Sequence, residues 1–101
     1  MAIVEINIIP LGTETPSLSK YVASAVKILQ KEKDLKYEVN SMGTVIEGDL
    51  DKILVVARKM HEAPFREGLA RVETIIKIDD RRDKTLSMSG KVESLKEKLA
   101  Y

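Results

Sequence analysis

The chain contains no cysteine, no tryptophan and a single histidine, His61, among its 101 residues. Without cysteine it can form no disulfide framework, no thiolate metal site and no cysteine nucleophile. One histidine cannot supply a metal site made of several imidazoles. These absences exclude proteins that depend on reactive cysteines or on clusters of histidine.

An excess of positive charge is also missing. Lysine and arginine number 17 against 16 aspartate and glutamate residues, which gives a formal net charge of +1. A protein that binds duplex nucleic acid through phosphates usually has a basic excess, so this balance counts against that class. No apolar run approaches the roughly 20 residues of a membrane span, and the chain does not begin like a signal peptide. We therefore expect a cytoplasmic protein that binds neither nucleic acid nor membrane.

Apolar residues are plentiful by contrast. Hydrophobic residues form 44% of the chain and charged residues 33%, which is enough for a core and a well-solvated surface. This composition excludes disorder as the main state of the chain. Its length suits one domain and leaves little room for a second, so we predict a single domain over residues 1–101.

The first part of the chain predicts a strand followed by a helix. Apolar residues alternate over residues 2–9, which is strand periodicity, and Pro10 is expected to end the strand. Thr15 followed by Pro16 is typical of a helix N-cap with proline at the first helical position. Apolar residues at helical spacing then predict a helix over residues 16–32.

The middle of the chain predicts a hairpin and a second helix. Residues 36–42 and 44–48 are predicted as two strands joined near Gly43. Asp49 is placed to cap the helix that follows. Pro64 is expected to stop that helix or to bend it, because proline in a helix interior loses a hydrogen bond.

The last part supplies a fourth strand and completes the fold. Gly68 marks a turn, residues 71–79 alternate again, and a short amphipathic helix begins near Gly90. The order is therefore βαββαβ with a C-terminal helix. Right-handed crossovers fold this order into a four-stranded antiparallel sheet with both main helices on one face. The predicted class is α+β, ferredoxin-like, with the first and third strands at the centre.

One face of this sheet is predicted to have no cover within the chain. Alternation assigns Ile3, Ile9, Val45 and Ile75 to this open face, where they lie among carboxylates and amides. Isolated hydrophobes on a solvated face are common in antiparallel sheets. An apolar patch of this kind also suits a sheet-to-sheet interface. We expect the second case, a homo-oligomer built as a dimer of dimers.

Recognisable catalytic patterns are missing as well. Neither a GxGxxG nor a Walker A pattern occurs, and no nucleophile, base and acid form a set. RNA recognition on this fold needs aromatic residues on the central strands, and none falls there. His61, near the end of the second helix, is expected to be structural. The sequence therefore favours a binding protein without catalytic residue, metal or cofactor over an enzyme.

Four local strings carry a likeness to a known family. They are Pro10-Leu11-Gly12-Thr13, Ser41-Met42-Gly43-Thr44-Val45-Ile46-Glu47-Gly48, Gly68-Leu69-Ala70-Arg71-Val72 and Ile78-Asp79-Asp80-Arg81-Arg82-Asp83. Together they resemble the small thiamine-binding, YkoF-like family of ferredoxin-like proteins, over essentially the whole chain. The resemblance implies binding of thiamine or its hydroxymethylpyrimidine moiety, no known catalysis, and assembly through sheets into dimers and tetramers.

Several residues have the chemistry that such a ligand would need. Thiamine combines a cationic thiazolium with an aminopyrimidine edge of donors and acceptors, and Glu47, Asn40, Thr44 and Met42 offer a carboxylate, neutral polar groups and sulfur within one hairpin. Glu47 is predicted to anchor the aminopyrimidine by a charge-assisted bond. Further hydroxyl groups are expected from three residues near the first helix: Thr13, Ser19 and Tyr21. Ordinary hairpin, capping and core roles remain the alternative for these residues.

Two classes of function stay open at this level. The first is a small-molecule binding protein for thiamine-like pyrimidines. The second is an oligomeric regulatory or protein-interaction module without a small ligand, in which the open sheet face or the Arg81-Arg82 pair contacts another protein. Stabilisation by a specific ligand would separate them, because such a ligand stabilises only the folded state.

Overall fold

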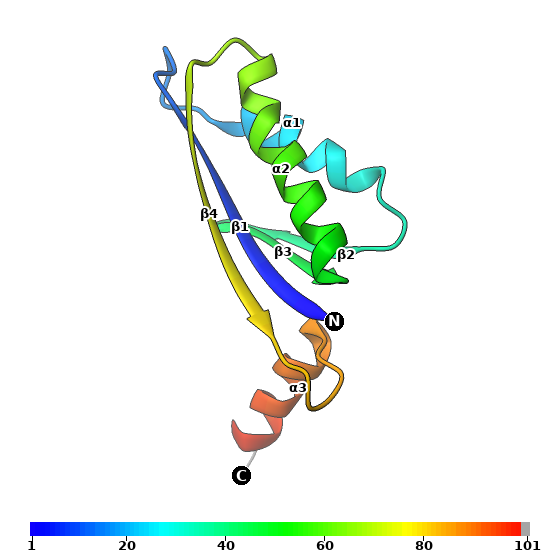
Figure 1. Ribbon diagram of the computed structural model, residues 1–101. Helices are drawn as coiled ribbons and strands as arrows, with labels where there is room; N and C mark the ends of the chain where they lie inside the picture. Colours follow the sequence, from blue (N-terminus) through cyan, green and yellow to red (C-terminus); the bar gives the residue numbers. More distant parts are fainter. Residues whose placement is uncertain (100–101) are drawn as a thin grey trace.

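The computed structural model describes residues 1–99, which form an antiparallel four-stranded sheet in the spatial order β2-β3-β1-β4. Helices α1 and α2 lie on one face of this sheet, and α3 lies beyond its end (Figure 1). Along the chain the elements are β1 (Ala2–Leu11), α1 (Ser19–Gln30), β2 (Lys36–Asn40), β3 (Gly43–Gly48), α2 (Leu50–Arg66), β4 (Arg71–Asp80) and α3 (Met88–Leu99). This arrangement confirms the predicted ferredoxin-like fold, with the first and third strands at the centre.

The core fills the space between the sheet and the two helices. Val4 and Ile6 of β1 point into it as the alternation predicts, and Ile46 of β3 lies directly opposite Val4. The helices contribute Ala25, Leu29, Ile53, Val56, Ala57, Met60 and Ala63. Full burial of a large aliphatic side chain is worth about 1.5–3 kcal/mol, so this layer is the main source of stability.

β1 is two residues longer than predicted, because Pro10 does not end it. Pro10 lies within the strand, opposite Val72 of β4, whereas β3 accompanies β1 only as far as Ile6. The carbonyl oxygen of Ile6 is turned toward β3, 3.2 Å from where a Cβ of Gly43 would lie. The N–H and C=O groups of successive residues in a strand point alternately to its two sides, so those of every second residue after Ile6 point to the same side. The nitrogen of Pro10 therefore faces the side of β3, where β1 no longer has a partner strand. Its missing N–H therefore costs no hydrogen bond of the sheet.

α1 begins three residues later than predicted, at the start of Ser19–Gln30. The prediction of an N-cap at Thr15 followed by Pro16 is wrong, since Leu18 occupies the N-cap position and makes no side-chain cap bond. The hydroxyl of Thr13 donates a hydrogen bond of 2.7 Å to the carbonyl oxygen of Thr15. Local bonds between side chain and backbone stabilise turns in competition with helix, which explains the late start.

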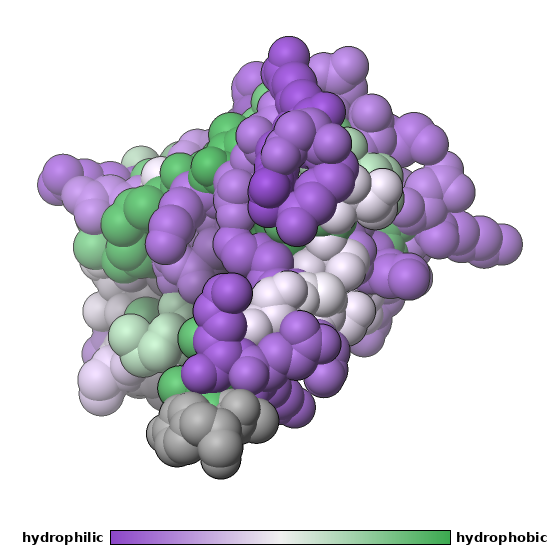
Figure 2. Space-filling view, turned by 90° about the horizontal axis from the view of Figure 1, so that it is seen from below, coloured by the Kyte–Doolittle hydropathy of each residue, from purple (hydrophilic) through white to green (hydrophobic). Residues whose placement is uncertain are grey.

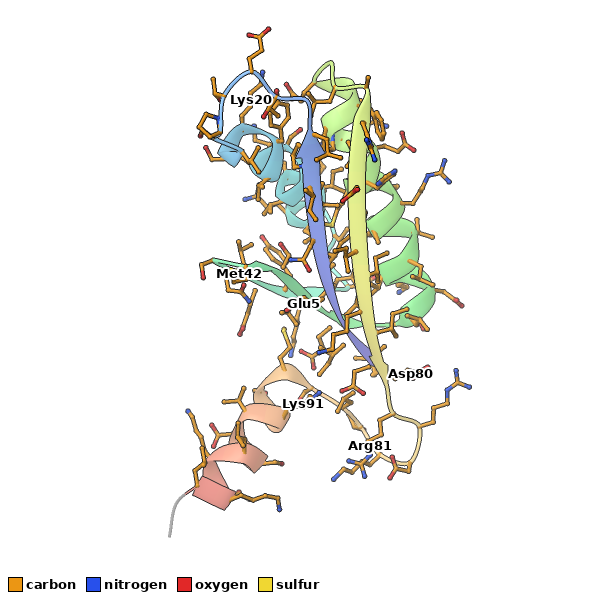
Figure 3. All side chains as sticks on the ribbon, turned by 90° about the vertical axis from the view of Figure 1, so that its left-hand side faces the viewer. Glu5, Lys20, Met42, Asp80, Arg81 and Lys91 are labelled. Atoms are coloured by element: carbon orange, nitrogen blue, oxygen red, sulfur yellow. The ribbon has the colours of Figure 1, made fainter. Side chains whose placement is uncertain are left out.

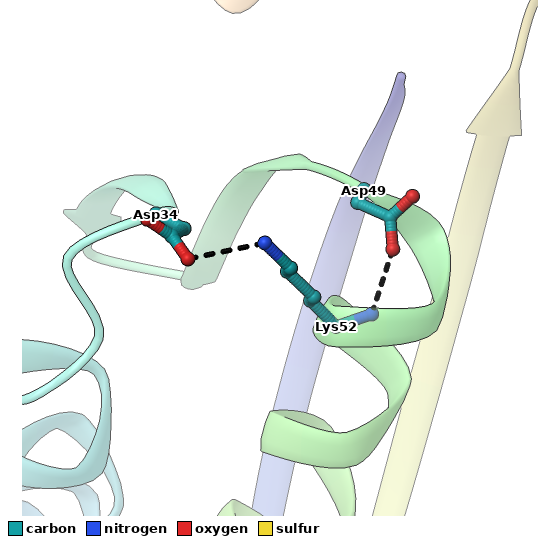
Figure 4. Close-up of polar contacts among 3 residues, drawn as sticks. All are labelled: Asp34, Asp49 and Lys52. Carbon is teal, nitrogen blue, oxygen red and sulfur yellow. Dashed lines mark hydrogen bonds and ion pairs between the residues drawn. The ribbon is translucent and has the colours of Figure 1, made fainter.

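α2 begins where Asp49 caps it, as predicted. A carboxylate oxygen of Asp49 accepts a 3.2 Å hydrogen bond from the backbone N–H of Lys52 (Figure 4). The ammonium of Lys52 also donates to Asp34 at 3.1 Å, which ties the loop before β2 to the helix. This bond and the charge of Asp34 raise the pKa of Lys52. Pro64 does not stop the helix; it lies in the last turn, and the helix continues to Arg66.

The cap predicts a measurable loss of stability. Replacing Asp49 with alanine should lower the free energy of unfolding by about 1 kcal/mol, because the N–H of Lys52 loses its acceptor. Asp34→Ala is the matched control: it removes the same charge but only an exposed ion pair, so a much smaller loss is expected. Urea denaturation of both variants measures the difference. Equal losses would contradict the capping role.

The open face of the sheet is partly covered by the chain itself, contrary to the prediction. The segment after β4 turns back (Figure 3). Lys91 of α3 forms an ion pair with Asp79 of β4. Ile3 of β1, which lies directly opposite Asp79, is buried. Leu86 in the returning segment is buried as well. One of the four apolar residues assigned to the open face is therefore not available to a partner, whereas Ile75 remains exposed.

α3 begins two residues before the predicted Gly90 and buries none of its side chains. Its apolar residues Val92, Leu95 and Leu99 are all exposed. Figure 2 shows this end of the molecule, where hydrophilic side chains cover most of the surface and hydrophobic ones form smaller areas. The position of α3 thus depends on contacts at its start rather than on a buried face.

Candidate functional site

A cleft of about 490 Å³ opens between α1, the second half of β1 and the tip of the β2–β3 hairpin. Its floor is formed by residues 6–9 and its hairpin wall by residues 39–44. The opposite wall consists of Val22, Ala25 and Val26 on α1 and of Leu18 at its N-cap. Small-molecule pockets have volumes of about 300–1,000 Å³ and mostly apolar linings with a few polar groups. The cleft has these properties.

The cleft exists because β1 loses one neighbour partway along its length. β3 pairs with β1 as far as Ile6, and beyond that point β1 pairs only with β4. Since the carbonyl of Ile6 is turned toward β3, alternation turns the N–H and C=O of Ile8 to the same side. That side lies in the cleft, which Ile8 lines. The floor of the cleft therefore presents a backbone donor beside a backbone acceptor.

Asn7 and Gly43 hold the hairpin tip against β1. The side-chain amide of Asn7 donates a hydrogen bond to the carbonyl oxygen of Met42. A Cβ at Gly43 would lie 2.5 Å from the same amide nitrogen, so only glycine leaves room for this crossing. Asn40 supports the turn from the other side, because its side-chain oxygen accepts a 2.9 Å hydrogen bond from the N–H of Met42. These contacts fix the width of the cleft.

Three of the seven predicted site residues line this cleft. Asn40, Met42 and Thr44 all belong to its hairpin wall. Thr44 is buried on the helix side, directly opposite Ile6, and Met42 is exposed at the tip. The structure therefore brings these three positions together in one cleft, and their role in ligand binding stays a prediction. Asn7, which the sequence did not single out, joins them.

Glu47 is not brought to the cleft. It lies three residues after Thr44 on the same strand, so its side chain points to the opposite face of the sheet. It is only 8% exposed and lies directly opposite Ile3 on β1 and Lys36 on β2. Glu47 therefore lies outside the cleft that Thr44 lines, although both come from one hairpin.

Thr13 and Tyr21 lie at a different hollow, of about 470 Å³, near the start of α1. There the ammonium of Lys20 lies 5.6 Å from the centre of the Tyr21 ring and pairs with Glu67 at 3.6 Å. Ser19 begins α1, and its hydroxyl lies 3.5 Å from that of Ser17, on the exposed surface. None of the three predicted hydroxyl residues lines the cleft.

His61 connects α2 to the edge of the sheet. Its Nδ1 lies 2.6 Å from the hydroxyl oxygen of Thr74 on β4, and its ring meets Phe65 edge-on at 5.5 Å between centres. These contacts are structural, and His61 does not line the cleft. Within residues 1–99, no group of three acidic or histidine side chains is placed to hold a metal ion.

The described helices are also too short or too polar to cross a membrane.

Comparison with known proteins assigns the chain to a family. A family model with the description "Thiamine-binding protein" matches residues 4–96. The chain belongs to this family. The matched residues include the second half of β1, α1 and the β2–β3 hairpin, so all three sides of the cleft lie within the residues that this family model matches.

Similar proteins cover nearly the whole chain. The UPF0045 protein YqgV of Bacillus subtilis (strain 168) is 51% identical over 102 residues, which cover 98% of each chain. A UPF0045 protein of Methanothermobacter thermautotrophicus is 47% identical over 100 residues, 98% of this chain and 100% of the relative. The crystal structure of hypothetical protein MJ1052 of Methanocaldococcus jannaschii superposes with a TM-score of 0.85 at 42% identity, covering 95% and 96% of the two chains. These similarities confirm the predicted family and fold.

Proposed function

We propose that the protein binds thiamine, or its free hydroxymethylpyrimidine moiety, in the cleft beside α1. The family to which the chain belongs is described by thiamine binding. The cleft has the volume and the apolar walls that suit a small flat ring. The observation that carries the proposal is the unpaired backbone of Ile8 on the cleft floor. No catalytic step is required of the protein in this function.

The Ile8 backbone complements the hydrogen-bonding edge of an aminopyrimidine. The ligand presents an amine donor next to a ring-nitrogen acceptor, and a strand residue presents its C=O acceptor and N–H donor in the same direction. Two bonds can therefore form side by side, as between neighbouring strands. The ring then packs between the apolar wall of α1 and the sulfur of Met42. The side chains of Asn40 and Thr44 offer further polar contacts.

Calorimetric titration with thiamine and with each of its two halves tests the proposal. Because the aminopyrimidine is the part that is recognised, hydroxymethylpyrimidine should bind within about tenfold of thiamine, which is a difference of at most about 1.4 kcal/mol. The hydroxyethylthiazole half should not bind. Binding of the thiazole half alone would reverse the assigned orientation. Absence of binding by both thiamine and hydroxymethylpyrimidine would contradict the proposal and favour an interaction module instead.

The Glu47→Gln variant distinguishes ligand binding in the cleft from ligand binding at Glu47, the anchor predicted from the sequence. If the carboxylate anchored the aminopyrimidine, the loss of its charge should weaken binding by roughly tenfold to a hundredfold. With the ligand in the cleft, Glu47 lies on the other face of the sheet, and we expect an unchanged dissociation constant. Thr44→Val is the matched variant inside the cleft, where a loss is expected. The reverse order of effects would place the ligand on the open face.

A further inference from the structure

Two of the four methionines of the chain line the cleft, and they differ in their access to solvent. Met60 of α2 belongs to the packed core and is 1% exposed. Met42 lies at the tip of the β2–β3 hairpin (Figure 3), and it is 79% exposed. A reagent in solution that attacks methionine sulfur therefore reaches one of the two sulfur atoms of the cleft and not the other.

Methionine is also the only residue type through which this chain carries sulfur, because it has no cysteine. Hydrogen peroxide oxidises the thioether of methionine to a sulfoxide. An electron pair of the sulfur forms a bond to one peroxide oxygen, the O–O bond breaks, and the other oxygen leaves as water. The sulfur is thereby oxidised by two electrons and the peroxide is reduced by two. Methionine sulfoxide reductases reverse the change at an accessible side chain.

The hairpin tip holds Met42 by its backbone and not by its sulfur. The N–H of Met42 donates a 2.9 Å hydrogen bond to the side-chain oxygen of Asn40, and its carbonyl oxygen accepts one from the side-chain amide of Asn7. Both bonds persist when the sulfur gains an oxygen. Because the side chain is largely exposed, a change in its polarity also has little effect on the stability of the fold. Oxidation therefore alters one wall of the cleft while the fold remains.

We propose that Met42 is a peroxide-sensitive switch of the cleft: oxidation to the sulfoxide weakens ligand binding, and reduction restores it. This inference rests on the proposed function, in which the sulfur of Met42 packs on one side of the pyrimidine ring. A thioether makes favourable contacts with an aromatic ring. A sulfoxide is polar, and burying it against the ring without a hydrogen-bond partner costs free energy. The oxidised side chain therefore turns toward water and leaves that side of the ring uncovered.

The rest of the hairpin wall has little apolar surface with which to replace the lost contact. Residues 39–44 form this wall, and Val39 is its only large apolar side chain besides Met42. The other four residues are polar or small. The opposite wall on α1 is apolar throughout, so a ring that loses Met42 keeps an apolar contact mainly on the α1 side. This difference makes Met42 the sensitive position of the cleft.

Calorimetric titration with thiamine, before and after treatment with hydrogen peroxide, tests the switch. Peroxide should raise the dissociation constant of the wild-type protein by about tenfold, and methionine sulfoxide reductases for both epimers, with dithiothreitol, should restore it. Met42→Leu keeps an apolar side chain and the other three methionines, so its dissociation constant should not respond to peroxide. Met42→Gln imitates the sulfoxide with a polar side chain of similar length, and it should bind about tenfold more weakly without any peroxide.

Mass spectrometry of the oxidised peptides gives a second readout. Met42 should be oxidised faster than Met60, and saturating thiamine should slow the oxidation of Met42 but not that of Met88, which begins α3 outside the cleft. Equal thiamine binding by the reduced and the oxidised wild-type protein, or an equal response of Met42→Leu to peroxide, would overturn the switch alone. Absence of binding by the reduced protein to both thiamine and hydroxymethylpyrimidine would overturn the proposed function and the switch with it.

Discussion

Replacing Val22 with tryptophan is expected to raise the dissociation constant for thiamine by about a hundredfold or more. Val22 lies on the α1 wall of the cleft and is partly exposed into it. An indole there occupies the space that the pyrimidine ring needs. The fold should tolerate the change, because the added atoms enter an existing cleft rather than the packed core.

Ala23→Trp is the control for the cleft-filling variant. Ala23 is the next residue of α1, it is exposed, and it does not line the cleft. The Ala23→Trp substitution places the same indole on the same helix but outside the cleft. It should therefore leave the dissociation constant for thiamine unchanged. Circular dichroism of both variants checks the fold, and calorimetric titration measures the affinity. A folded Val22→Trp protein that bound thiamine like the wild type would remove the cleft from the function.

Replacing Ile46 with alanine should give a large loss of stability, about 2–5 kcal/mol. Ile46 is fully buried and lies directly opposite Val4 on β1 and Tyr37 on β2. Its truncation removes apolar contacts from both neighbouring strands and leaves a cavity in the core between sheet and helices. A domain of this size has about 5–15 kcal/mol of stability in total, so the loss is a large fraction of it.

A graded series makes this prediction specific to burial. Ile46→Val removes one methylene group and should cost about 0.5–1.5 kcal/mol. Val39→Ala on the neighbouring strand β2 removes apolar atoms from an exposed side chain and should cost less than Ile46→Ala. Urea denaturation of the three variants measures the free energies of unfolding. Comparable losses for Ile46→Ala and Val39→Ala would contradict the assignment of Ile46 to the centre of the core.

Local patterns were sufficient for most of the fold. The alternation of Val4 and Ile6 with their neighbours assigned the buried face of β1, because a strand buried on one face has a period of two. Asp49 was recognised as the cap of α2, because a cap depends on residues three positions apart. The order of strands and helices then led to the sheet topology through the handedness of the crossovers.

Two local signals failed because other contacts outweighed them. Thr15 and Pro16 resemble a helix start, but hydrogen bonds such as that from Thr13 hold the segment as a turn. Pro10 resembles a strand end, but it is harmless in β1 because no strand lies beside its nitrogen. The first failure comes from competing local bonds. The second depends on where another strand ends.

Part of the candidate site could also be predicted from the sequence, and part of it could not. Asn40, Met42 and Thr44 could be chosen from the hairpin sequence by their chemistry, and the structure brings them together. The separation of Glu47 from Thr44 could also have been inferred, because residues three apart on a strand point to opposite faces. The role proposed for Ile8 could not have been inferred from the sequence, since its side chain gives no sign that its backbone groups lack a partner strand.

The sequence by itself determined the order of elements, the buried face of the central strands and the cap of α2, because each follows from residues that are near one another in the chain. It also indicated the family, through four short strings spread over the chain. Tertiary structure decided the cleft and the free edge of β4. Both depend on where one strand stops beside another: β3 leaves β1 after Ile6, and within the described residues no strand follows β4. Unpaired backbone groups at such places are created by the arrangement of whole strands, so no side chain in the sequence signals them.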